Sequence, residues 1–193
     1  MQRRSFIQWI TATGLGAMLG PVRAATNVPS IRFLRPPGAL AETDFLARCI
    51  RCGNCGEACP NRCISFFQTE NGLPSMGTPY IIPREQACIL CMKCGVACPT
   101  GALTPIEPDA EHIMKKVRMG IARVDQQLCL SYQGKTCGVC YRACPLQDVA
   151  IRVQLLEQPV VMDKCVGCGL CERSCIQIPQ AIRILPLYSG TPA

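Results

Sequence analysis

The sequence predicts an α+β fold built from four short tandem repeats that are rich in loops. A run of four cysteines occurs four times along the 193 residues. Short apolar segments flank the runs with a period of about 30–40 residues, which is typical of an internal repeat. The chain has 16 glycines and 16 prolines but only 5% aromatic residues, so we do not expect a large apolar core.

The cysteine runs are the strongest signal in the chain. Three of them read C-x2-C-x2-C-x3-C, and in the third run seven residues separate the first two cysteines. Thiolates are the ligands that iron–sulfur clusters prefer, and this spacing is that of bacterial ferredoxins. We therefore expect four [4Fe–4S] clusters, with sixteen of the 17 cysteines as ligands. The runs are Cys49, Cys52, Cys55 and Cys59; Cys88, Cys91, Cys94 and Cys98; Cys129, Cys137, Cys140 and Cys144; and Cys165, Cys168, Cys171 and Cys175.

Residues next to the runs support this interpretation. Proline follows the first three runs, at Pro60, Pro99 and Pro145, as in the ferredoxin motif, whereas Ile176 follows the fourth. The fourth cysteine of such a run usually ligates the other cluster of a pair. The sequence leaves open whether the first run pairs with the second or with the fourth.

Two other uses of cysteine are less compatible with the pattern. Zinc sites favour separated cysteine pairs, often with histidine, and the single histidine, His112, lies outside every run. Disulfide frameworks favour an even number of cysteines, and 17 is odd. A zinc-binding structural protein remains an alternative.

Residues 1–24 have the pattern of an export signal. Arg3 and Arg4 resemble a twin-arginine motif, and the apolar run that ends at Leu19 is too short to span a bilayer. Small residues favour cleavage after Ala24 or one residue later; an uncleaved amphipathic anchor is the alternative. The twin-arginine route exports folded proteins, so we expect a periplasmic protein whose clusters are assembled beforehand.

The remaining chain divides by composition and repeat. We expect a lead at 25–45, units 1 and 2 at 46–104, a linker at 105–119, units 3 and 4 at 120–187 and a tail at 188–193. Pro36 and Pro37 exclude a helix in the lead, and Thr43-Asp44 is a candidate cap for a short helix ending at Arg48. The linker is expected to be solvated or a surface helix.

Each unit is expected to consist of a strand, a cysteine loop, a short helix and a second strand. The first two units resemble each other, as do the last two, which predicts two duplicated two-cluster blocks. The predicted strands are 64–67, 80–82, 102–104, 121–124, 149–153, 160–162 and 182–185.

The seventeenth cysteine, Cys63, has a place in this repeat. It lies four residues after Cys59, where Ala102 follows Cys98; Ala150 and Ala181 take the same place in the later units. We therefore predict that Cys63 is buried as an alanine substitute and is not a ligand. Residues 130–136, which widen the third run, are predicted to form an exposed turn around Tyr132-Gln-Gly134.

Net charge does not indicate a nucleic-acid partner. The charge of +7 falls to +4 without residues 1–24, which hold Arg3, Arg4, Arg23 and no acid. Each oxidised cluster with its thiolates adds about two negative charges, so the holoprotein is expected to be mildly acidic. No catalytic constellation, dinucleotide fingerprint or C-x-x-C-H haem motif occurs after the signal, so we expect an electron carrier without a substrate site.

Short motifs beyond the cysteines resemble the NapG/MauM group of ferredoxin-type proteins. The likeness covers the twin-arginine start, the four runs with the widened third, Leu34-Arg-Pro-Pro-Gly-Ala39, Gly77-Thr-Pro-Tyr80, Arg118-Met-Gly120, Val124-Asp125 and Ala181-Ile182. The resemblance implies tandem bacterial-ferredoxin-type repeats and a periplasmic carrier with four [4Fe–4S] clusters.

The resemblance also implies partners. One is a membrane-bound quinol-oxidising ferredoxin-type protein of the NapH kind; the other is a periplasmic cytochrome or reductase of nitrate reduction or methylamine utilisation. The mature chain has no apolar run long enough to span a membrane. The iron–sulfur subunit of a membrane-associated molybdenum oxidoreductase is the main alternative, because such subunits carry four runs as well.

Overall fold

The computed structural model describes residues 33–69 and 75–187. The predicted signal at 1–24, the start of the lead and the tail at 188–193 lie outside the described residues. Helices of four to seven residues and strands of two to five are joined by loops that make up most of the chain. The predicted loop-rich repeats are therefore present; with so little regular structure, the α+β class stays a prediction.

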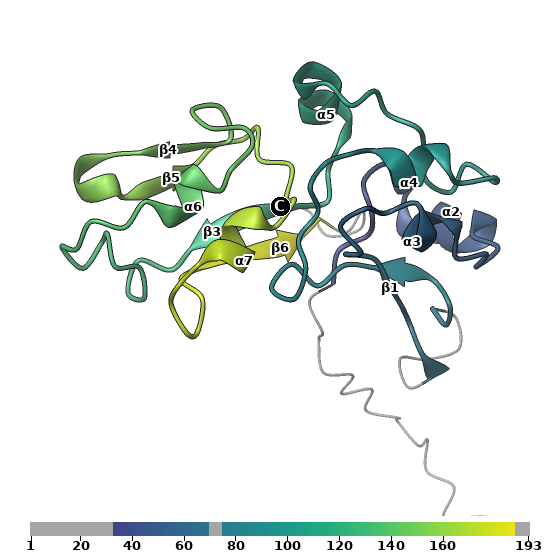
Figure 1. Cartoon of the computed structure of the whole chain (residues 1–193), viewed down its shortest axis with the longest axis horizontal. Helices are drawn as coiled ribbons and strands as arrows, with labels where there is room; N and C mark the ends of the chain where they lie inside the picture. The colour runs from purple at the N-terminus through teal and green to yellow at the C-terminus, as the bar shows by residue number, and fades with distance from the viewer. Residues whose placement is uncertain (1–32, 70–74, 188–193) are drawn as a thin grey trace, which may run out of the picture. The chain divides into compact units, whose positions relative to one another are not determined.

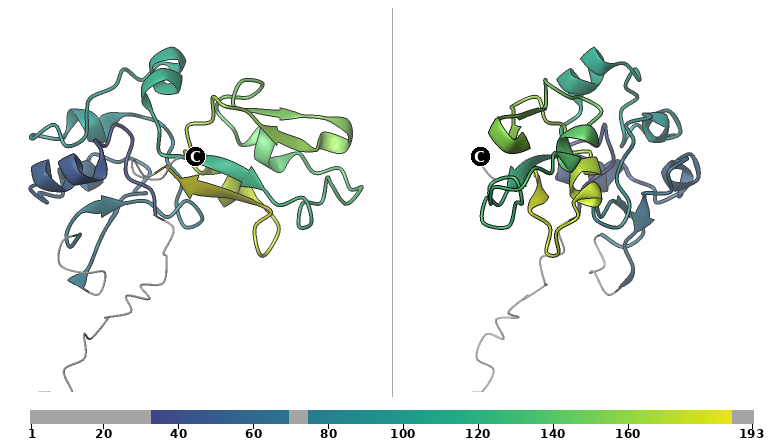
Figure 2. Two further views of the ribbon diagram at one scale, coloured as in Figure 1. Left: turned by 180° about the vertical axis from the view of Figure 1, so that it is seen from behind. Right: turned by 60° about the vertical axis from the view of Figure 1, so that its left-hand side comes forward.

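In the second half of the chain, two strand pairs join units 3 and 4. β3 (Gly120–Val124) pairs with β6 (Ile182–Pro186), and β4 (Ile151–Val153) pairs with β5 (Pro159–Val161), both antiparallel. A 3-10 turn at Leu155–Glu157 connects β4 to β5. Seen from behind, β3 and β6 lie side by side (Figure 2). The first strand of unit 3 thus pairs with the last strand of unit 4.

The first half repeats this pattern with fewer residues. β1 (Ser65–Phe66) pairs with β2 (Pro79–Tyr80), and a bridge between Ala39 and Leu103 takes the place of the β3–β6 pair. The bridge is extended by a hydrogen bond from Thr104 N to Gly38 O of 2.8 Å. The lead therefore takes the place of a first strand of unit 1, although it forms only a bridge there, which alternation of apolar residues did not reveal.

A short helix begins inside each cysteine run. These are α3 (Asn54–Glu57), α4 (Lys93–Val96), α6 (Val139–Arg142) and α7 (Leu170–Ser174), and each contains the third cysteine of its run (Figure 1). The residue before each helix has a positive φ, between 53° and 88°. This left-handed residue reverses the chain between the second and third cysteines. Glycine occupies three of these positions and Met92 the fourth.

The helix predicted near Arg48 forms, but its predicted cap is wrong. α2 spans Glu42–Arg48 and follows Ala41, with no side-chain cap. Glu42 is held by Arg35, whose Nε lies 2.9 Å from Oε2. The helix begins before Thr43, because Phe45 N already donates a hydrogen bond to Ala41 O at 2.7 Å. Phe45 on its inner face is fully buried beneath the Arg35 guanidinium.

The predicted linker contributes to the core. Within it lies α5 (Ala110–Lys116), capped by the Asp109 carboxylate, which accepts a hydrogen bond from His112 N at 3.0 Å. Ile113, Val117 and Met119 are buried in the main apolar cluster. The stretch between the halves is thus a packed surface helix with its polar face outward, as the alternative of a surface helix predicted.

Loops of the two halves touch directly. Cys88 N donates to Cys168 O at 2.9 Å. The Arg84 guanidinium donates to the carbonyls of Glu172, Arg173 and Cys175 at 3.2, 3.1 and 2.9 Å. Charged donors make the stronger kind of hydrogen bond, so Arg84 holds the end of α7 against the second cysteine run.

We predict that Gly38→Ala destabilises the protein by about 2–4 kcal/mol, because a methyl group there would lie 2.4 Å from Thr104 O and the φ of +80° disfavours side chains. Gly134→Ala is the matched control: its φ is +83°, but nothing lies within 4 Å of the added methyl group. It should cost only about 1 kcal/mol. Rates of cluster loss in denaturant, followed by visible absorbance, compare the two; equal rates would contradict the close approach of Gly38 to Thr104.

Candidate iron–sulfur sites

The sixteen run cysteines gather around four separate cavities. Each cavity is lined by the first three cysteines of one run and the fourth cysteine of another. We number the sites by the run that supplies three cysteines. Site 1 has Cys49, Cys52, Cys55 and Cys98; site 2 has Cys88, Cys91, Cys94 and Cys59; site 3 has Cys129, Cys137, Cys140 and Cys175; site 4 has Cys165, Cys168, Cys171 and Cys144.

This arrangement answers the pairing that the sequence left open. The first run exchanges its fourth cysteine with the second run, and the third run with the fourth. The strand pairs explain the exchange: the Ala39–Leu103 bridge brings Cys98 to the first run, and β3–β6 brings Cys175 to the third. A cysteine loop therefore cannot complete its own cavity; the neighbouring unit completes it.

The donor set fits a [4Fe–4S] cluster. A cube needs four thiolates spread around it, and each cavity presents four thiols around 290–390 Å³ of empty space, counting its opening to solvent. Within 33–69 and 75–187, no three His, Cys, Asp or Glu side chains are arranged to hold a single metal ion.

Burial disfavours ionisation of some of these thiols. It raises the pKa of Cys94 and of Cys168 to about 12, and that of Cys55 and of Cys140 to about 11. These thiols carry their protons at neutral pH until a cation displaces them. Cluster assembly is therefore coupled to proton release, as in other thiolate metal sites.

Hydrogen bonds to sulfur differ between the sites. Burial opposes ionisation of Cys98, but hydrogen bonds from Leu103 N (3.4 Å) and the Thr100 hydroxyl (3.7 Å) outweigh it and lower its pKa. At site 2, Leu90 N lies 3.4 Å from Cys88 Sγ. Donors of this kind stabilise negative charge on the sulfurs and adjust cluster potentials.

Cys63 lies at site 2. It is buried, as predicted, but it also lines the cavity together with the four thiols of the site. Hydrogen bonding to Cys88, followed by burial, raises the pKa of Cys63 well above its usual value. The repeat alignment correctly placed Cys63 at the alanine position; that this position faces a cavity is visible only in the folded chain.

The four sites form a series through their contacts. Sites 1 and 2 share two units, and so do sites 3 and 4; the hydrogen bond from Cys88 N to Cys168 O joins site 2 to site 4. The order is therefore 1, 2, 4, 3, with sites 1 and 3 at the ends. Exposed apolar side chains stand next to the end sites, at Ile50 beside Cys49 and at Ile176 and Ile178 after Cys175. Ile89 and Val96 are also exposed, next to Cys88 and Cys94 of the inner site 2.

The widened third run keeps its first cysteine at the cavity. Cys129 N donates to Asp125 O at 3.0 Å, which anchors Cys129 at the end of β3. Residues 133–136 are exposed, in line with the predicted turn, whereas Tyr132 is half-buried and donates its hydroxyl to Pro159 O at 3.2 Å. Residues 133–136 of the insertion thus face solvent, while Tyr132 contacts the start of β5 beside site 3.

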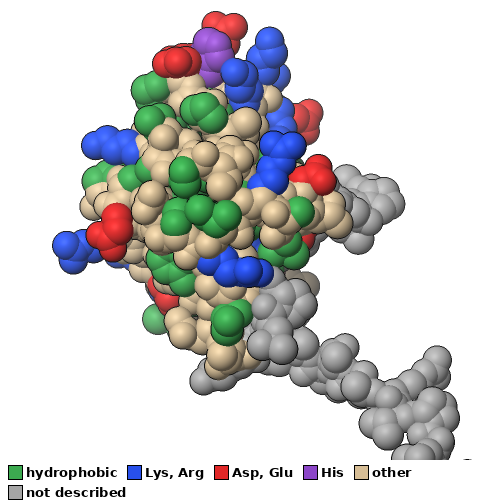
Figure 3. All heavy atoms as spheres, turned by 90° about the vertical axis from the view of Figure 1, so that its right-hand side faces the viewer, with side chains coloured by type: hydrophobic (Ala, Val, Ile, Leu, Met, Phe, Trp, Pro, Cys, Tyr) green, Lys and Arg blue, Asp and Glu red, His purple; other side chains and the backbone are tan. Residues whose placement is uncertain are grey.

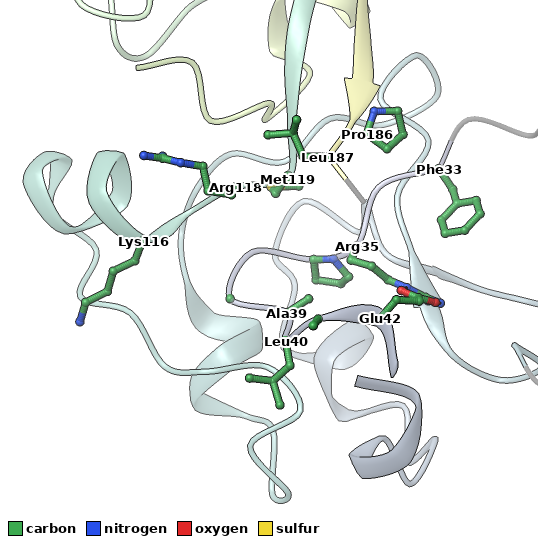
Figure 4. A pocket seen from close by; sticks show the side chains of 13 residues that line it. Phe33, Arg35, Ala39, Leu40, Glu42, Lys116, Arg118, Met119, Pro186 and Leu187 are labelled. Carbon is green, nitrogen blue, oxygen red and sulfur yellow. Dashed lines mark hydrogen bonds and ion pairs between the residues drawn. The ribbon is translucent and has the colours of Figure 1, made fainter. Parts of the chain in front are cut away.

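A further hollow is lined by residues of the lead, α5 and the end of β6, without any cysteine (Figure 4). Arg35 is held by Glu42, and Arg118 donates to the carbonyls of Met114 and Val117. These contacts hold Arg35 within the protein, whereas the exposed Arg118 uses only its Nη1 in them.

The surface carries mixed charge. On the face shown in Figure 3, Lys and Arg side chains alternate with Asp and Glu, with apolar side chains scattered between them. The positive formal charge is therefore not collected into one patch on this face. Of the helices described, none is long and apolar enough to cross a bilayer.

Comparison with protein families agrees with the geometry. One model of a 4Fe-4S dicluster domain matches twice, at residues 48–102 and 87–148, and a second such model matches 121–176. These matches cover all four runs. The chain thus contains tandem dicluster domains that bind [4Fe–4S] clusters.

Curated relatives match over most of the chain. The methylamine utilization ferredoxin-type protein MauM of Methylorubrum extorquens is 43% identical, over 90% of this chain and 81% of its own length. MauM of Methylobacillus flagellatus is 43% identical over 84% and 72%. The ferredoxin-type protein NapG of Escherichia coli is 40% identical over 96% and 86%. The chain belongs to the NapG/MauM family of ferredoxin-type iron–sulfur proteins.

Proposed function

We propose that this protein is a periplasmic electron relay that carries four [4Fe–4S] clusters, one at each four-cysteine site. The observation that carries the proposal is the series of four cavities, each lined by four thiols from two units. Each bound cluster accepts and returns one electron. The sixteen run cysteines hold the clusters, and no residue acts on a substrate.

The polypeptide supports relay in two ways. It buries seven of the sixteen run cysteines, which keeps water from those sulfurs, and it joins sites 2 and 4 through the hydrogen bond from Cys88 N to Cys168 O. Electrons would enter at one end site and leave at the other. Cys52 of site 1 is exposed, and Ile176 and Ile178 project beside site 3, so both ends are open to partners.

The proposed electron donor is a membrane-bound quinol-oxidising protein of the NapH kind. The proposed acceptor is a periplasmic cytochrome or reductase of nitrate reduction or methylamine utilisation. Relatives named for both pathways are similar to this chain, so the pathway has to be identified from the partner protein. A carrier whose clusters are inserted before export requires a route for folded proteins, in keeping with Arg3-Arg4.

Substitution in pairs tests the exchanged ligands. Cys52→Ala with Cys98→Ala removes two thiols from one cavity, and we expect the loss of one cluster, about four of about sixteen iron atoms per chain. Cys91→Ala with Cys98→Ala removes two thiols from one run but from two cavities, and should cost about eight. Iron and sulfide analysis under anaerobic conditions measures this. The reverse order would show that each run holds its own cluster, and a wild-type protein without iron would contradict the function itself.

Partner capture tests the relay. We expect the tagged protein, isolated anaerobically from detergent-solubilised cells, to bring down a polytopic quinol-oxidising protein. A molybdenum subunit in equal amount would contradict an independent carrier. Replacing Ile176 and Ile178 with Ser should reduce recovery of one partner several-fold, because exposed apolar side chains at an interface contribute much of its binding energy. Ile50→Ser, at the other end of the series, is the matched control and should spare that same partner.

The export route has its own test. Changing Arg3 and Arg4 to Lys should leave the precursor in the cytoplasm with its clusters, since the folded part of the chain is untouched. Fractionation followed by immunoblotting measures the distribution. Normal appearance in the periplasm would contradict the twin-arginine route.

A further inference from the structure

Site 2 differs from the other three sites in holding a fifth thiol. Cys63 is 4% exposed and lines the cavity with Cys59, Cys88, Cys91 and Cys94. In each of the other cavities the same repeat position holds an alanine: Ala102 at site 1, Ala181 at site 3 and Ala150 at site 4. The three sites with alanine can therefore be compared with site 2 to find the effect of a thiol at this position.

The fifth thiol lies against ligand positions of its site. Cys63 Sγ is 3.5 Å from Cys59 Sγ, and its side chain also reaches that of Cys88. A thiolate that binds iron has no proton to donate. When Cys59 and Cys88 bind iron, Cys63 is the thiol of the three that keeps its proton, and both neighbouring sulfurs can only accept a hydrogen bond from it.

We propose that the Cys63 thiol is a positioning residue that donates a hydrogen bond to a ligand sulfur of site 2, Cys88 Sγ or Cys59 Sγ, and raises the reduction potential of the second cluster. Reduction adds one electron to the cluster and moves no proton. The added negative charge spreads onto the ligand sulfurs, where a donor stabilises it. Alanine at the other sites offers no such donor.

The position of site 2 gives this hydrogen bond a role. Site 2 is the inner site of the first half and touches site 4 through Cys88 N and Cys168 O. The Cys63 donor shifts the distribution of an electron within the first half toward site 2, against the Thr100 and Leu103 donors at Cys98 of site 1. The step between the halves would then start or end at the cluster that Cys63 adjusts.

The test compares variants at one repeat position, and it depends on the proposed four clusters, so iron and sulfide are first counted in the wild type. Redox titration with dithionite, followed by electron paramagnetic resonance, gives the four couples. With Cys63→Ala we expect full iron content. We also expect one cluster to have a lower reduction potential, by up to about 59 mV, which corresponds to about a tenfold change in its one-electron reduction equilibrium. Cys63→Ser keeps a donor and should restore most of the shift.

Ala102→Cys is the matched gain-of-donor variant, because Ala102 follows Cys98 at the four-residue distance that separates Cys63 from Cys59. This variant should raise the reduction potential of a different cluster from the one that Cys63→Ala affects. An unchanged set of couples in Cys63→Ala would overturn the proposal, and so would equal shifts in Cys63→Ser and Cys63→Ala. Loss of about four iron atoms in Cys63→Ala would make Cys63 a ligand and also overturn it. A wild type without clusters would refute the proposed function instead, so the two failures are distinguishable.

Discussion

Four thiols must surround one cluster, and this requirement organises the rest of the structure. A cysteine loop of this spacing presents three thiols to one cavity, and the fourth comes from a neighbouring unit. Two units can exchange their last cysteines only if their ends lie side by side. The β3–β6 pair and the Ala39–Leu103 bridge provide this contact in the two halves. Cluster ligation by two units therefore requires the strand pairing that brings their cysteines together.

The same constraint accounts for the scarcity of regular structure. Helices of four or five residues inside the runs are too short to be stable alone; their role is to present the third cysteine. Buried alanines, or Cys63, stand where a larger side chain would enter a cavity. Apolar burial by Ile81, Val117 and Ile182 supports the halves, and ligation supplies much of the remaining folding free energy.

Contacts between the halves turn two dicluster units into one series of sites. The backbone bond from Cys88 to Cys168 and the three hydrogen bonds from Arg84 hold the inner sites together. The end sites keep exposed side chains beside them, which suits exchange with partners. Differences in sulfur hydrogen bonding, at Thr100 and at Cys63, give chemically similar sites distinct surroundings.

The sequence by itself determined the cluster type, the four-unit repeat, most strand positions and the alanine equivalence of Cys63. These features depend on spacing within a few residues, which local chain geometry preserves. It did not determine which runs exchange cysteines, because that depends on strand pairs between residues as distant as Ala39 and Leu103. Nor did it reveal the bridge between the lead and Leu103, because a single bridge shows no alternation, or the start of α2, where Phe45 N donates to Ala41 O. Only the tertiary structure placed Cys63 against Cys59 at site 2 and site 2 against site 4, because both contacts join groups whose orientation no spacing rule specifies.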